Sequence, residues 1–397
     1  MILFLLPLYA AKTFGSHSLF ATQAIVAVPA LVTILASNVW GAAADLLGRS
    51  LPLVAAALGC YAATFWALSR ATTLPEALAI VVIGACGYAG AAPLVRSHVT
   101  LPTRADDGGT ARRGRALGML LLAETLGLAL ANGLASGRYD ATRGADSGMT
   151  PILLGIGTLA ALGAIVVGVA GTSEARRPRE VMSGGWSAAL FGDLRDVYRV
   201  VPLRTVVLVA LPTFAGQFVY VSTANLLLRD HWGLAAGMVA RVLAVHAVLG
   251  LTVFPFAGRL ADRYGGRRVL AIGAVAQAVK FALLWHAPSV AAACICAVLP
   301  AFPLVTTGSA AAIAETSRVS KRAGGMGVLM GSLSAGAAIG PLAAGLVADR
   351  AGLGATPLLA SLFATLTVIA SLMTGFFTGT PAAPTMKPRV MEGREDQ

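Results

Sequence analysis

The sequence contains little charge for its length. Of its 397 residues, 12% are Asp, Glu, Lys or Arg, about half of the roughly 25% that soluble globular chains carry. Acidic residues are the scarcest, with 18 Asp and Glu against 30 Lys and Arg. A soluble chain of this size needs more charge to cover its surface, so the composition excludes a soluble enzyme, a disordered scaffold and a fibrous protein.

Cysteine, histidine and known catalytic motifs are also scarce. The four cysteines lie in apolar stretches, and the nearest two, Cys294 and Cys296, have neither a redox nor a zinc-site spacing. The five histidines are scattered, and the sequence contains no HExxH zinc motif and no phosphate-binding loop of the GxxxxGKS or GxxxxGKT type. We therefore expect no disulfide, metal or cofactor, no enzymatic activity and no ATP-driven pump.

Apolar residues, by contrast, make up 57% of the chain, and there are 45 glycines and 19 prolines. Glycine and proline are more frequent in membrane helices than in soluble ones, so the composition predicts an all-α membrane protein with many spans. A helix needs about 20 apolar residues to cross the hydrocarbon core. Eleven runs approach or reach this length, at residues 21–41, 51–69, 75–96, 116–136, 151–171, 204–227, 237–257, 269–287, 289–312, 325–347 and 353–377.

Before these runs lies Met1–Ala11, an apolar segment of about half a span, followed by KTFGSHSLFATQ, which is typical of an external turn. At 1.5 Å per residue the segment provides about 16 Å of helix against a hydrocarbon core of about 30 Å. We therefore expect about twelve spans, the first one truncated, and a native product that begins about 10 to 25 residues earlier. An intact-mass measurement on protein expressed from its own locus tests this expectation.

The basic residues predict how the spans are oriented. Most Lys and Arg follow even-numbered spans, and because positive loops face the cytoplasm, both termini are expected there. The net charge of +12 is assigned to this topology rather than to nucleic-acid binding. The long basic connection then divides the chain into an N-terminal six-helix bundle (1–171), a cytoplasmic central loop (172–203), a C-terminal six-helix bundle (204–377) and a cytoplasmic tail (378–397).

An internal repeat supports this division. GAAADLLGRS (41–50) follows the second span and GRLADRYGGRR (258–268) follows the eighth, so that Asp45 and Asp262 lie 217 residues apart. Both copies face the same side of the membrane in the predicted topology. The sequence therefore predicts two six-helix bundles related as a parallel pseudo-repeat about an axis along the membrane normal.

The loop at 258–268 closely resembles the signature loop of the major facilitator superfamily. The resemblance covers nearly the whole chain, through the span count, the central loop and the repeat, and it implies the fold of that family. It also implies that both loops latch the two halves together on the cytoplasmic side, where an aspartate can accept hydrogen bonds from a helix N-terminus. The alternative is that their charges only set the topology. The latch candidates are Gly41, Asp45, Gly48, Arg49, Gly258, Asp262, Arg263, Gly265, Arg267 and Arg268.

The eleventh span adds a second resemblance. Gly336 and Gly340 expose backbone for close helix packing, and Pro341 is expected to bend the helix. Drug–proton antiporters of the family have a similar Gly–Pro motif in span five, where this chain has glycines but no proline. The chain thus resembles the drug and organic-solute antiporter branch with one departure from its pattern.

Ionisable residues inside apolar runs are functional hypotheses by default. Glu124, about eight residues into the fifth span, is a candidate for proton coupling, and the alternative is a structural hydrogen bond to a neighbouring helix. His246 is either a titratable cavity residue or a partner in a helix–helix hydrogen bond. Lys280 and Arg241 can snorkel to the outer interface, although Lys280 is also a cavity candidate, and Arg96 is expected to anchor at the cytoplasmic surface.

Polar uncharged residues indicate a substrate cavity. Gln217, Tyr220 and Asn225 give the seventh span a polar stripe, which is typical of a helix that lines a water-filled cavity. The family resemblance also implies that this span lines the cavity. Asn38 and Asn132 are further candidates, although a single Asn can simply tie two helices together.

These observations predict a secondary active transporter that moves a small organic solute by alternating access. Proton-coupled efflux is the leading hypothesis; the alternatives are proton-coupled uptake of an organic nutrient and a non-transporting receptor or scaffold on the same fold. A cavity with few charges argues against a multivalent anion. The expected partners are the solute, protons and the lipid bilayer, and we expect a monomer in the plasma membrane that binds no nucleic acid.

Overall fold

The structure is a computed structural model that describes residues 19–99, 116–124, 126–127, 145–174, 200–317 and 322–377. These residues form helices joined by short turns, and ten segments are long and apolar enough to cross a membrane. The helices of the N-terminal half are α2 (Leu19–Leu47), α3 (Leu51–Leu68), α4 (Leu74–Tyr88), α5 (Ala91–Val99) and α7 (Ala145–Thr172), and residues 116–124 are also helical.

The C-terminal half contains a longer series of helices. Two of them are short: η1, a turn of π-helix that continues α9, and η3, a 3₁₀ turn that precedes α15. The series is α9 (Val201–Leu226), η1 (Leu227–His231), α10 (Ala236–Tyr264), α11 (Gly266–Trp285), α12 (Val290–Val298), α13 (Phe302–Thr316), α14 (Arg322–Ala351), η3 (Leu353–Ala355) and α15 (Thr356–Met373).

The all-α membrane architecture predicted from the apolar runs is confirmed in the described residues. Met1–Ala11, most of the 172–203 connection and the 378–397 tail lie outside them. Two predicted runs are each divided into two helices, at the α4–α5 and α12–α13 junctions. The second break has a local cause: Pro300 has no N–H to donate, and Leu299 before it is extended, at φ −61° and ψ 121°.

The repeated loop has the same backbone feature in both halves. Gly48 ends α2 with φ +66°, and Gly265 separates α10 from α11 with φ +86°. Only glycine adopts this left-handed conformation without steric cost. The spacing of the two motifs therefore reflects two equivalent chain reversals.

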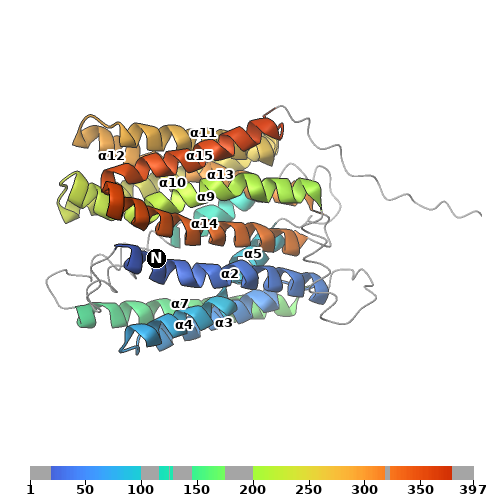
Figure 1. Cartoon of the computed structure of the whole chain (residues 1–397). Helices are drawn as coiled ribbons and strands as arrows, with labels where there is room; N and C mark the ends of the chain where they lie inside the picture. The colour runs from blue at the N-terminus through green and yellow to red at the C-terminus, as the bar shows by residue number, and fades with distance from the viewer. Residues whose placement is uncertain are drawn as a thin grey trace, which may run out of the picture.

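Figure 1 shows how the halves meet. α2 and α14 lie side by side in the middle, with α3, α4 and α7 on one side and the remaining C-terminal helices on the other. Gly327 of α14 permits a close approach of the two helices, since a Cβ added there would lie only 2.7 Å from the Ser37 carbonyl oxygen of α2. The Ser37 hydroxyl also donates to the Gly327 carbonyl at 3.2 Å. A second junction places Gly118 against the backbone of α10 at Phe254.

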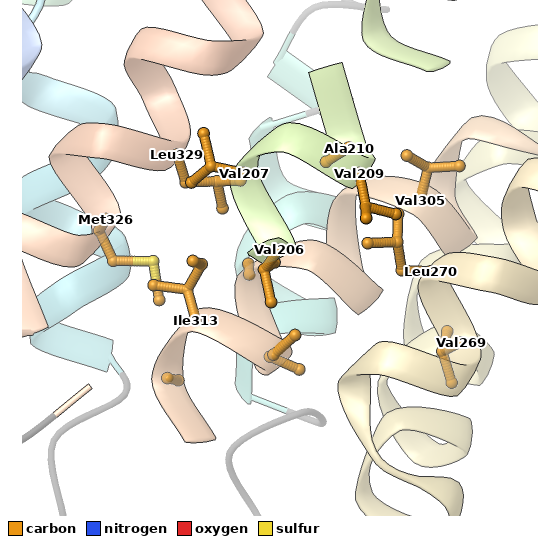
Figure 2. Close-up of a cluster of buried hydrophobic side chains, with 14 of the residues drawn as sticks. Val206, Val207, Val209, Ala210, Val269, Leu270, Val305, Ile313, Met326 and Leu329 are labelled. Atoms are coloured by element: carbon orange, nitrogen blue, oxygen red, sulfur yellow. The ribbon is translucent and has the colours of Figure 1, made fainter. Parts of the chain in front are cut away.

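The largest apolar cluster lies mostly in the C-terminal half, and Leu117 of the N-terminal half also belongs to it. Figure 2 shows side chains that meet there, among them Val206 of α9, Leu270 of α11, Ile313 of α13 and Leu329 of α14. Small residues let these helices approach closely, since a Cβ on Gly273 would lie 2.8 Å from the Val305 nitrogen. This packing holds α9 and α11 together, and both contribute polar side chains to the regions described next.

Candidate functional site

An ion pair lies where the two halves meet. Arg96, in the last turn of α5, donates from Nη2 to Oε2 of Glu124 at 2.8 Å. Its Nη1 lies 3.0 Å from the sulfur of Met330 on α14, in the other half. The Arg96 side chain is 7% exposed and that of Glu124 is 38% exposed. The pair therefore belongs to the N-terminal half, and its cation rests directly on the C-terminal half.

This geometry changes the interpretation of both residues. Arg96 is buried and paired with a carboxylate, so the expected anchor at the cytoplasmic surface is wrong. Glu124 is not the isolated buried acid that its place in the span suggested, because an arginine neutralises it. Breaking this pair would remove a countercharge from the buried Arg96 guanidinium, which is unfavourable.

Two polar residues of α9, Thr213 and Gln217, form hydrogen bonds with α11. Gln277 of α11 donates from Nε2 to Oε1 of Gln217 at 2.9 Å and accepts a short hydrogen bond from the Thr213 hydroxyl. All three side chains are buried. In this structure the Oε1 atom of Gln217 is thus bonded inside the C-terminal half, and a role for Gln217 in lining a substrate cavity stays a prediction.

A second polar group lies one helical turn further along. The Lys280 Nζ sits 4.5 Å from the centre of the Tyr220 ring, and Lys280 is 2% exposed, so it does not snorkel to the interface. The Tyr220 hydroxyl donates to the Ala297 carbonyl at 3.1 Å, and His246 Nδ1 donates to the Val298 carbonyl at 3.2 Å. The rings of Tyr220 and His246 meet edge to face with centres 6.3 Å apart. Tyr220, like Gln217, faces the interior of its own half.

The asparagine candidates are dispersed. Asn38 is buried between α2 and α14, where its Nδ2 donates to the Ile34 carbonyl at 2.6 Å. A Cβ on Gly331 would lie 3.2 Å from that nitrogen, so Asn38 belongs to the junction of the halves. Asn225 is half-buried near the end of α9. Asn132 lies outside the described residues.

The loop between α10 and α11 holds its basic residues near aromatic rings. The guanidinium of Arg267 lies 5.5 Å from the centre of the Phe376 ring, and that of Arg263 lies 5.3 Å from the Tyr264 ring. Glu315, at the end of α13, accepts from the Gly266 N–H at 2.9 Å and so caps α11. The sequence analysis did not predict a role for Glu315. The feature that could have indicated it is an acidic residue at the end of an apolar run, next to a basic loop.

The corresponding position of the N-terminal half is also capped by an unpredicted glutamate. Glu174, just after α7, accepts from the backbone N–H groups of Ser50 and Leu51 at 3.1 and 2.9 Å, which begin α3. His98 Nδ1 lies 3.3 Å from the same carboxylate. Burial opposes the charge, but these donors outweigh it and lower the pKa of Glu174.

The structure describes the first copy of the latch motif in part. In α2, Gly41 is buried and Arg49, after the helix end, is exposed. The side chain of Asp45 lies outside the described part of the structure. In the second copy, Gly258 packs near Gly118 at the junction of the halves.

The predicted packing glycines of α14 lie against α9. A Cβ on Gly336 would lie 2.7 Å from Cβ of Phe214, and one on Gly340 would lie 2.5 Å from the Ala215 carbonyl oxygen. Pro341 follows directly within the helix. These residues therefore act within the C-terminal half, one turn apart on a single face.

Comparison with known proteins supports the fold described above. Residues 206–395 match the family model of the Major Facilitator Superfamily. No curated protein matches the sequence. The crystal structure of the human organic anion transporter MFSD10 (TETRAN) is similar, with 16% identity and a TM-score of 0.73 over 92% of this chain and 87% of that one.

Two other solved structures are also similar, with somewhat lower TM-scores. FucP, a Major Facilitator Superfamily transporter in the outward conformation, shares 16% identity, with a TM-score of 0.64 over 91% of this chain and 90% of its own. A double tryptophan mutant of XylE shares 15% identity, with a TM-score of 0.67 over 96% of both chains. At these identities the similarity describes the fold.

Proposed function

The chain has the fold of the Major Facilitator Superfamily and matches its family model over residues 206–395, and we propose that it is a secondary transporter of a small organic solute. The observation that carries the proposal is the Arg96–Glu124 ion pair, which one half contributes and which rests on Met330 of the other half. Because the pair touches both halves, a change in its protonation can change how the two halves are positioned relative to each other.

The coupling step is a single protonation. When a proton binds the Glu124 carboxylate, the ion pair becomes a neutral acid next to a charged arginine. Arg96 then loses the negative charge of Glu124, which favours states in which it leaves Met330 and reaches water. Because α14 supplies that contact, the proton shifts the equilibrium between closed and separated halves.

Efflux is the proposed direction, in exchange for protons. The support is the resemblance of the 258–268 loop and of the glycine-rich spans to the drug and organic-solute antiporter branch. Proton-coupled uptake moves solute and proton in the same direction, so the two mechanisms differ in the sign of a pH change. A non-transporting receptor produces no pH change.

The test uses the purified full chain in liposomes that contain a pH-sensitive dye. Candidate organic solutes are added outside, and antiport makes the lumen more alkaline as solute enters in exchange for protons. Glu124→Gln should abolish gradient-driven movement, although equilibrium exchange of solute survives. Glu76→Gln, an exposed acid in the same half, serves as the control and should transport normally. PH-dependent active transport by Glu124→Gln at the wild-type rate would remove Glu124 from the mechanism.

A further inference from the structure

Lys280 occupies the buried face of α11. Gln277, Lys280 and Leu284 follow each other at helical spacing and are buried, whereas Val275 and Val279 on the opposite face are exposed. The ammonium therefore points into the C-terminal half. Lys280 lies five residues before the end of the helix at Trp285, which corresponds to about 8 Å of rise. It is therefore buried because its side chain points into the protein, although the helix end is near.

The groups around this ammonium attract it without neutralising it. The Tyr220 and Phe281 rings lie 4.5 and 5.6 Å from Nζ, and ring faces stabilise a cation through their quadrupole. The acidic protons of Tyr220 and His246 are already donated to backbone carbonyls of Ala297 and Val298. The immediate surroundings thus consist of aromatic rings and neutral groups, the Cys296 thiol among them, and they contain no carboxylate from the described residues.

Nor does a carboxylate lie within ion-pair distance among the described residues. Residues 200–377 contain four acids, all near helix ends, of which Asp230 binds Arg229 at 2.6 Å and Glu315 binds Gly266. Of all the acids in the sequence, Glu124 alone lies well inside a predicted apolar run, and Arg96 holds it. Lys280 therefore lies buried in a candidate membrane span without a carboxylate partner among the described residues.

We propose that Lys280 is the countercharge for a monovalent anion that binds inside the C-terminal half, next to Tyr220 and His246. A single cation favours one negative charge and disfavours divalent anions, whose second charge would stay unpaired. Two sources share this chemistry: chloride, or the carboxylate of the transported solute. The second source rests on the proposed transport function, whereas the first does not.

Binding is measured on the purified full chain in lipid nanodiscs, without any proton gradient. Chloride is titrated and its NMR line broadening recorded, and benzoate and sulfate are added as competitors. We expect saturable broadening in the wild type and about tenfold weaker binding in Lys280→Gln, the loss expected for a charge-assisted contact. Lys280→Arg should retain binding, and Arg241→Gln, an exposed cation of α10, should match the wild type.

The competitors distinguish the sources. Displacement of chloride by benzoate but not by sulfate shows a site that accepts a carboxylate, and resistance to benzoate shows a chloride site. Saturable binding of equal strength in wild type and Lys280→Gln, or no saturable binding of either monovalent anion to the wild type, would overturn the proposal. Failure of proton-coupled transport in liposomes leaves these results unchanged, so the two proposals fail independently.

Stability supplies a second readout that does not depend on competitors. Without a bound anion, Lys280→Met removes an uncompensated buried charge and should raise the thermal midpoint in sulfate buffer. Added chloride or benzoate should raise the midpoint of the wild type and leave that of Lys280→Met unchanged. A lower midpoint for Lys280→Met in sulfate, or an equal anion response in both proteins, would contradict the proposal.

Discussion

A single carboxylate can fasten a helix by accepting backbone hydrogen bonds, and Glu174 does so for α3. The N–H groups of Ser50 and Leu51 are among the donors that the first turn of a helix leaves without intrahelical partners. Their glutamate lies 124 residues away from Ser50 in the sequence. Nothing in the local pattern at either site indicates the contact, because a cap of this kind is formed by tertiary packing.

This cap predicts a pH-dependent contribution to stability. The pKa of Glu174 is lowered in the folded protein from an ordinary value of 4.5, so its contribution is present at neutral pH and is lost as the pH falls through the folded value. Glu174→Gln should lower the free energy of unfolding by about 1 kcal/mol at pH 7, since charge-assisted hydrogen bonds become neutral ones. Thermal unfolding in detergent measures this difference.

The same variant should differ little from the wild type at acidic pH, where the wild-type carboxyl is protonated. Asp349→Asn, at an exposed acid near the end of α14, is the control and should leave the midpoint unchanged at both pH values. A Glu174→Gln deficit that persists undiminished in acid would show that the cap does not act through its charge.

At the scale of elements, the apolar runs predicted where the helices lie, and the repeated loop predicted two equivalent reversals. Run length and glycine content are properties of one segment, so they can be found without tertiary information. The rotation of each helix is not such a property. Gln217 and Lys280 lie in apolar runs that tolerate either orientation, and only packing of α9 against α11 turns both inward.

Helix packing predicts that alanine substitution changes the free energy of unfolding in opposite directions at two glycines. Gly340→Ala should lower the free energy of unfolding by about 1–3 kcal/mol, because the new Cβ would lie 2.5 Å from the Ala215 carbonyl oxygen. Gly250→Ala in α10, with nothing within 4 Å of the added Cβ, should stabilise slightly through helix propensity. Equal effects of the two substitutions on thermal unfolding would refute the close-packing argument.

At the scale of the whole molecule, α2 and α14 form the seam between the halves, with Ser37 and Gly327 in contact. Alternating access requires such a seam to open. A substituent that prevents close approach should therefore favour the separated state over the closed one without touching the Arg96–Glu124 pair.

Gly327→Ala tests this, since its Cβ would lie 2.7 Å from the Ser37 carbonyl oxygen. In a background with the four native cysteines replaced, Asn38→Cys is labelled with a polar maleimide, and Gly327→Ala should speed the labelling severalfold. Gly59→Ala in α3, where the added Cβ meets nothing within 4 Å, should leave the rate unchanged. Equal labelling rates with and without Gly327→Ala would place the opening elsewhere.

Pro300 has no backbone N–H, and this affects the positions of side chains on other helices. In an unbroken helix, the carbonyls of Ala297 and Val298 would accept from N–H groups four residues on; because Pro300 ends α12, they instead accept from Tyr220 and His246. The two side chains thus bind where the helical hydrogen-bond pattern is interrupted. Their positions therefore depend on the break that Pro300 introduces, and a mutation that restored a continuous helix would remove the hydrogen-bond acceptors of both side chains.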